Sequence, residues 1–128
     1  MTTTTKGSKK SILVADDSIT ARTLERYILE AAGYDVTLAG NGREAWEMLA
    51  QKDFDLVISD IRMPHMDGLD LTRRIKQSEK HRDVPVILLT SLDSREDKER
   101  GIEAGADAYI AKSSLDQAKL LEVVRRLI

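Results

Sequence analysis

The sequence predicts a single α/β domain with a doubly wound parallel sheet, and three observations lead to this class. Five short apolar runs rich in β-branched residues alternate with amphipathic segments, which is the pattern of consecutive βαβ units. The chain has 128 residues, of which 41% are hydrophobic, and this is enough for one core of ordinary size. Because βαβ connections are right-handed, we expect helices on both faces of the sheet.

Each apolar run predicts one strand, and each amphipathic segment predicts one helix. The expected strands are Ile12–Ala15, Asp35–Ala39, Leu56–Ser59, Pro85–Thr90 and Ala108–Ala111. The expected helices are Ser18–Ala32, Arg43–Gln51, Leu69–Gln77, Ser94–Ala104 and Leu115–Ile128. Five strands alternating with five helices favour the flavodoxin-like (βα)5 arrangement, in which the strand order is 2-1-3-4-5.

Two of these helices carry specific expectations about packing. In the first helix, the apolar residues at helical spacing, which we expect to face the core, are Leu24, Tyr27, Ile28 and Ala31. The fourth helix contains an unbroken run of charged residues at 95–100, followed by Gly101. With so little to bury and a glycine in its interior, the fourth helix should be the most weakly anchored.

Composition excludes several classes of function. Lys and Arg total 20 against 22 Asp and Glu, a net charge of -2, which provides no basic surface for nucleic acid. The absence of cysteine excludes disulfides, a thiolate metal site and a cysteine nucleophile. No apolar run approaches the ~18 residues of a membrane span. We expect a cytoplasmic protein with no direct nucleic-acid or membrane partner, with 1–10 a flexible lead-in and 11–128 the domain.

Five polar residues are expected at the carboxyl-terminal edge of the sheet, namely Asp16, Asp17, Asp60, Thr90 and Lys112. In the expected strand order these residues follow neighbouring strands about 4.8 Å apart, so their side chains should converge. Three close carboxylates repel one another unless a cation neutralises them, and an oxygen-only ligand set favours Mg²⁺ or Mn²⁺. Lys112 and Thr90 then supply a cation and a hydroxyl for the oxygens of a phosphoryl group, with an Asp60 oxygen as the nucleophile.

From about residue 10 to its end, the chain resembles the response-regulator receiver domains of two-component signalling. The matching pieces are Val14–Ser18, Ser59–Pro64, Met66–Gly68, Leu89–Ser91 and Gly105–Lys112. Each piece is weak alone. All of them occur in the order and spacing of the family, so the combined signal is specific.

The resemblance implies a role for each residue of the expected site. Asp60 is implied to be the phosphoacceptor, receiving a phosphoryl group from a histidine kinase, with slow autodephosphorylation as the only turnover. The implied metal ligands are Asp16, Asp17, Asp60 and the backbone carbonyl of Arg62. The implied phosphate contacts are Thr90 and Lys112, and the implied switch residues are Thr90 and Tyr109. The switch is expected to act on the face formed by the fourth helix, fifth strand and fifth helix, where a downstream protein partner binds.

The chain departs from the family pattern at three places. Ser91 stands where a small alanine is usual. Ser113 follows Lys112 where proline is usual, which leaves the family's cis peptide open, because a cis bond before a non-proline residue costs about 2.5–4 kcal/mol. Arg62 and Leu92 occupy positions that tune phosphate lifetime in the family, so the sequence leaves that lifetime open.

Rival functions are less consistent with the sequence. A Mg²⁺-dependent aspartyl-phosphate phosphatase usually has a second Asp two residues after its nucleophile, where this chain has Arg62. An FMN carrier needs hydroxyls and N–H groups in its first loop, which here is acidic at 16–17. His65 and His81 lie in polar segments, so we expect both to be exposed and neither to be catalytic.

The stretch 112–117 resembles receivers at the C-terminus of chemotaxis-type hybrid histidine kinases. A stand-alone chemotaxis-like regulator is the alternative. Since the sequence ends with the expected fifth helix, we expect output through protein contact, either by this domain or within a larger protein.

Overall fold

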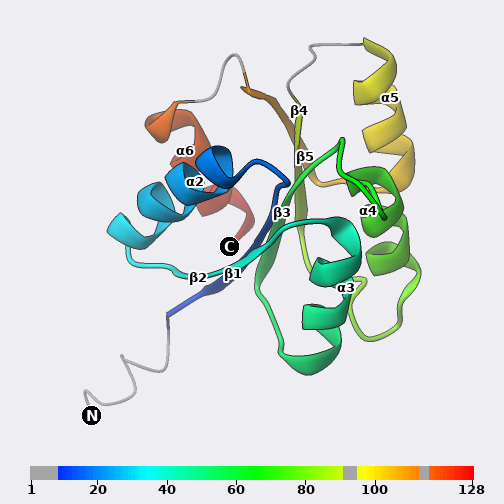
Figure 1. The fold of residues 1–128 in the computed structure, drawn as a ribbon, viewed down its shortest axis with the longest axis horizontal. Helices are drawn as coiled ribbons and strands as arrows, with labels where there is room; N and C mark the ends of the chain where they lie inside the picture. Colours follow the sequence, from blue (N-terminus) through cyan, green and yellow to red (C-terminus); the bar gives the residue numbers. More distant parts are fainter. Residues whose placement is uncertain (1–8, 91–94, 113–115) are drawn as a thin grey trace.

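The computed structural model describes residues 9–90, 95–112 and 116–128, and it contains a five-stranded sheet between two layers of helices (Figure 1). The strands are β1 Ser11–Ala15, β2 Asp35–Ala39, β3 Leu56–Asp60, β4 Val86–Thr90 and β5 Ala108–Ala111. Their order is β2-β1-β3-β4-β5, and all neighbouring pairs are parallel. The predicted fold class and strand order are therefore confirmed.

The helices are α2 Ile19–Ala31, α3 Gly42–Gln51, α4 Gly68–Gln77, α5 Arg95–Ala104 and α6 Gln117–Leu127. Helices α2 and α6 cover one face of the sheet, and α3, α4 and α5 cover the other (Figure 1). Four helices begin at a side-chain cap that accepts a backbone N–H of the first turn, the caps being Ser18, Asn41, Asp67 and Asp116. The predicted helix starts Ser94 and Leu115 lie outside the described residues. None of the helices within the described ranges is long and apolar enough to cross a membrane.

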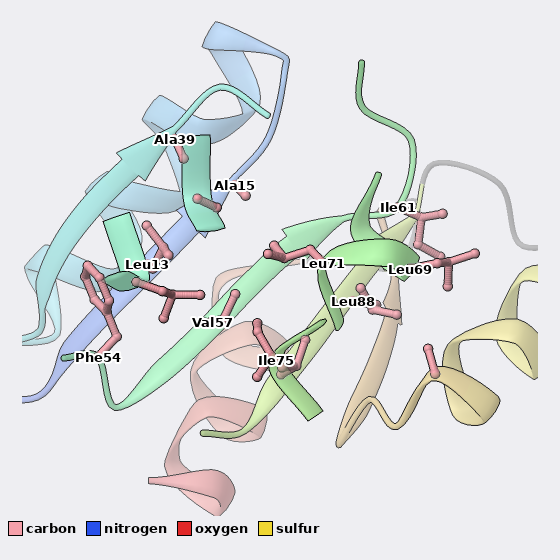
Figure 2. Close-up of a cluster of buried hydrophobic side chains, with 14 residues drawn as sticks. Leu13, Ala15, Ala39, Phe54, Val57, Ile61, Leu69, Leu71, Ile75 and Leu88 are labelled. Atoms are coloured by element: carbon pink, nitrogen blue, oxygen red, sulfur yellow. The ribbon is translucent and has the colours of Figure 1, made fainter. Parts of the chain in front are cut away.

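Consecutive residues of each strand pack on opposite faces of the sheet, as the pleat of a strand requires. In β3, Leu56 and Ile58 belong to the cluster under α2 and α6, whereas Val57 belongs to the cluster under α3, α4 and α5. Figure 2 shows this second cluster, in which Val57 and Leu88 of the sheet lie near Leu71 and Ile75 of α4. Both faces of the central strands are therefore buried, which explains why their sequences are almost continuously apolar.

The predicted inward face of α2 is wrong for three of its four residues, Leu24, Tyr27 and Ala31, all of which are exposed. Leu24 is 56% exposed and Tyr27 is 73% exposed, whereas Ile28 and Leu29 are buried together with Glu25. The helix is rotated so that the 25, 28, 29 face, rather than the 24, 27, 31 face, lies on the sheet. Both faces carry apolar residues at helical spacing, and only packing against the sheet distinguishes them.

The predicted exposure of His81 is also wrong. His81 is 7% exposed, and its ring lies edge-on to the ring of Trp46, with 5.7 Å between the ring centroids. His81 lies in the loop after α4 and Trp46 lies in α3, so the ring contact joins this loop to α3, and an aromatic pair of this geometry is favourable. His65 is exposed, as predicted.

Candidate phosphoacceptor and metal site

Strand pairing brings the first and third strand ends together at the carboxyl edge of the sheet. Ala15 pairs with Ser59, so the following residues, Asp16 and Asp60, lie side by side. Lys112 follows β5 and reaches over both of them, with its Nζ 2.8 Å from Asp16 Oδ2 and 3.2 Å from Asp60 Oδ2. The predicted convergence is thereby confirmed for Asp16, Asp60 and Lys112.

Three carboxylates form an acidic cluster at this edge. Asp16, Asp17 and Asp60 each place one oxygen within 4.8 Å of the other two. Asp16 is 0% exposed and Asp60 is 7% exposed, while Asp17 faces solvent. Lys112 contacts Asp16 and Asp60, and its single positive charge leaves two of the three negative charges of the ionised cluster unbalanced. An all-oxygen cluster of this charge fits a hard divalent cation such as Mg²⁺.

Burial and charge alter the proton affinities of this site. Burial raises the pKa of the Asp60 carboxyl above its usual range, Lys112 opposes that rise, and Asp16 adds to it. Burial alone would lower the pKa of Lys112, but its hydrogen bond to Asp16 and the charge of Asp60 raise that pKa overall. Lys112 is therefore held as a cation beside carboxylates that would gain from an additional positive charge.

Asp16 is fixed from several sides. Its Oδ1 accepts a hydrogen bond from the backbone N–H of Ser18 at 2.9 Å, and its own N–H donates to Ala39 O at 3.1 Å. The guanidinium of Arg22 donates to the Asp16 carbonyl at 3.0 Å. The first of these bonds orients the Asp16 carboxylate, and the other two hold the Asp16 backbone in place.

A glycine fixes the loop that follows Asp60. The N–H of Gly68 donates to Ile61 O at 2.8 Å, and a Cβ at Gly68 would overlap the carbonyl oxygen of Asp60. Only glycine allows this approach, so the loop between β3 and α4 folds back tightly over the strand end.

Three further residues of the predicted site, Thr90, Tyr109 and Arg62, lie within the described ranges. Thr90 is the last residue of β4, is 1% exposed, and pairs with Ala111 in β5. Tyr109 in β5 packs against the cluster under α3, α4 and α5. Arg62 follows β3, and its side chain extends to Asp97 of α5 rather than toward solvent alone. Ser91, Leu92 and Ser113, and with Ser113 the Lys112–Ser113 bond, lie outside the described residues.

Sequence reasoning missed Glu25. This residue of α2 is 2% exposed beside Asp16, and its Oε1 has no hydrogen-bond partner among the described residues. Burial raises the pKa of Glu25 to about 8, and the negative charge of Asp16 adds to the effect. The available signal was its spacing of three and four residues from Ile28 and Leu29, which places a carboxylate on the buried face.

Comparison with known proteins identifies the family. A family model described as the response regulator receiver domain matches residues 12–125. The receiver domain of a histidine kinase from Syntrophus aciditrophicus is 42% identical, with a TM-score of 0.86 over 92% of this chain and 89% of that chain. The receiver domain of a Pseudomonas aeruginosa sensor histidine kinase, solved with magnesium in its active-site cleft, is 32% identical, with a TM-score of 0.86 over 94% of this chain and 98% of that one.

A curated relative is much longer than this chain. The gliding motility regulatory protein of Myxococcus xanthus is 41% identical over 116 residues, which cover 91% of this chain and 15% of that protein. In two other curated relatives, the matched region covers about half of the relative's own length, 54% in one and 52% in the other. The match over nearly the whole of this chain, the strand order and the acidic cluster agree: the chain belongs to the response regulator receiver domain family of two-component systems.

Proposed function

We propose that this chain accepts a phosphoryl group from a histidine kinase on Asp60. The observation that carries the proposal is the position of the Asp60 carboxylate, which lies within the acidic cluster and 3.2 Å from the Nζ of Lys112. A nucleophile beside a fixed cation, at the carboxyl edge of a parallel sheet, is suited to phosphoryl transfer.

The acidic cluster is proposed to hold Mg²⁺, or Mn²⁺, through the carboxylates of Asp16, Asp17 and Asp60 and the backbone carbonyl of Arg62. When bound, such an ion supplies positive charge that stabilises the oxygens of the transferring group. The magnesium in the Pseudomonas aeruginosa relative supports this assignment. The two negative charges of the cluster that Lys112 does not balance also support this assignment.

The chain's own residues define the proposed transfer. An oxygen of the ionised Asp60 carboxylate attacks phosphorus, the bond between phosphorus and the donor imidazole nitrogen breaks, and the electron pair remains on that nitrogen. Lys112 Nζ and the Thr90 hydroxyl contact the phosphoryl oxygens. No base is required, because the nucleophile is already ionised when it attacks.

The proposed output is a change of surface. Thr90 and Tyr109 are proposed to relay the phosphorylated state to the surface formed by α5, β5 and α6, where a downstream protein partner binds. Autodephosphorylation is the only turnover proposed, and the chain is proposed to act in the cytoplasm without direct contact with nucleic acid or membrane. The length of the Myxococcus xanthus relative supports a position within a larger protein, such as the C-terminus of a chemotaxis-type hybrid histidine kinase.

Labelling with a small acyl phosphate tests the proposal. With Mg²⁺, intact-mass analysis should show one added phosphoryl group, which is absent in Asp60→Asn and greatly reduced in EDTA. Asp53→Asn is the matched control, since Asp53 is an exposed residue that precedes β3, and it should label like the parent chain. Labelling that persists in Asp60→Asn, or proceeds equally in EDTA, contradicts the proposed chemistry. Rapid multiple turnover of the acyl phosphate would instead favour a phosphatase.

A further inference from the structure

An ion pair joins the loop after Asp60 to the first turn of α5. The Nη2 of Arg62 lies 3.2 Å from Asp97 Oδ2 and 3.4 Å from Asp97 Oδ1. Arg62 is two residues beyond the proposed phosphoacceptor, and Asp97 is the third residue of α5. The contact therefore spans directly from the site to a helix of the proposed output surface.

The burial of this pair is strongly asymmetric. The Asp97 side chain is 3% exposed, whereas the Arg62 side chain is 61% exposed. Because the Asp97 carboxylate is buried, removing a cation from beside it costs more than breaking an ion pair in which both side chains face solvent. Within the same helix, Arg95 and Glu99 form such a surface pair, 3.9 Å apart, with side chains 94% and 63% exposed. Pairs of that kind contribute little.

Helix α5 has few other anchors of its own. The other residues it buries are Gly101 and Ala104, which have small side chains or none, while Ile102 is 62% exposed. A Cβ at Gly101 would lie 3.1 Å from Leu88 Cδ1 and 3.5 Å from Tyr109 Cδ2. A small displacement of α5 therefore changes the surroundings of Tyr109.

We propose, first, that the Arg62–Asp97 pair holds the first turn of α5 to the loop that follows Asp60. The second half of the proposal is that phosphorylation of Asp60 alters α5 through this pair. The second half of this inference rests on the function proposed above, since it concerns regulation by the same site. The route is separate from the relay through Thr90, because it starts from the loop after β3 rather than from the end of β4.

Hydrogen exchange in EDTA tests the first half without any ligand. In Asp97→Asn, the amides of α5 should exchange roughly fivefold faster than in the parent chain, which corresponds to the loss of a modest stabilising contact. Arg62→Gln should give an increase at least as large, because it removes the cation from beside a buried carboxylate, and the double variant should show less than the sum of the two single changes. Arg95→Gln is the matched control on the same helix and should leave these rates unchanged. Additive effects in the double variant, or an equal effect of Arg95→Gln, overturn the claim that the pair anchors α5.

Beryllofluoride with Mg²⁺, which imitates an acyl phosphate, tests the second half. Backbone NMR of the parent chain should show shifts at Asp16, Asp17 and Asp60 and also along α5. In Asp97→Asn the shifts of these three amides should persist, whereas those of α5 should fall by at least about half. Shifts of α5 that are unchanged in Asp97→Asn, or equally reduced in Arg95→Gln, overturn the inference. If the parent chain shows no response at the three acidic residues, the proposed function itself fails, and regulation through the pair fails with it; the hydrogen-exchange result then still decides whether the pair anchors α5.

Discussion

Replacing Glu25 by glutamine should remove a pH-dependent loss of stability in the metal-free protein. The carboxyl of Glu25 is 2% exposed, and burial, reinforced by Asp16, raises its pKa from 4.5 to about 8. The folded state therefore keeps a proton that the unfolded chain releases above pH 4.5 or so. Stability is fully present below that pH and is lost as pH rises toward 8.

The size of the effect follows from the two pKa values of Glu25, 4.5 unfolded and about 8 folded. Each pH unit between them is worth about 1.4 kcal/mol, so the parent chain should lose up to about 5 kcal/mol across this range from this group. Glutamine has the shape of the protonated side chain and its amide can donate to Asp16 as the acid does. Glu25→Gln should therefore be the more stable protein at pH 7 to 8 and should lose this component of the pH slope.

Urea denaturation in EDTA between pH 5 and pH 8 measures the difference. Glu30→Gln is the matched control, because Glu30 lies on the same helix with its side chain 50% exposed. Millimolar Mg²⁺ should reduce the difference in free energy of unfolding between the parent chain and Glu25→Gln, since a bound cation offsets the negative charges beside Glu25. If Glu25→Gln follows the same pH slope as the parent, or if Glu30→Gln changes the slope equally, the argument from burial is refuted.

Three further changes test the site and the loop around it. Asp17→Ala should remain folded but lose the stabilisation by Mg²⁺, which in the parent chain reaches about 2.7 kcal/mol when free Mg²⁺ is at a hundredfold excess over its Kd. Thermal melts with and without Mg²⁺ measure this, and an equal rise in Tm in both proteins would contradict it. Gly68→Ala should cost about 1–3 kcal/mol in urea denaturation, because its Cβ overlaps the Asp60 carbonyl, and an unchanged midpoint would show that the loop moves aside. Thr90→Ala should keep Asp60 phosphorylatable by intact mass while weakening beryllofluoride-induced NMR shifts at Tyr109; undiminished shifts there would contradict the Thr90 relay.

The sheet and the centre of the site could be predicted from the sequence because both depend on short-range signals. Continuous apolar runs identified the strands, and strand order then determined which strand ends are neighbours. The positions of Asp16, Asp60 and Lys112 followed, and their contacts are present. Their chemical roles stay predictions until they are tested by experiment.

The rotation of helices against the sheet could not be predicted in the same way. For α2, apolar spacing supported two neighbouring faces, and the one that is buried contains Glu25. A carboxylate is normally read as solvent-facing, so the pattern favoured the face with Leu24 and Tyr27. For α5, the charged run at 95–100 concealed the buried Asp97, whose spacing from Gly101 and Ala104 marks the inner face. In both helices, the face that is buried is determined by contacts with segments distant in the sequence.

Successive residues of a strand belong alternately to the two hydrophobic clusters, so the face of the sheet on which the Asp60 side chain lies depends on whether its position in β3 is odd or even. Leu56, Ile58 and Asp60 occupy alternate positions of β3, and Leu56 and Ile58 both pack under α2 and α6. Inserting or deleting one residue within β3 would exchange these residues with those packed under α3, α4 and α5, turning the Asp60 carboxylate through the sheet and away from Lys112. Changes in multiples of two preserve its side of the sheet. Length variation among functional relatives should therefore fall in the loops, and in β3 only even steps are compatible with the site.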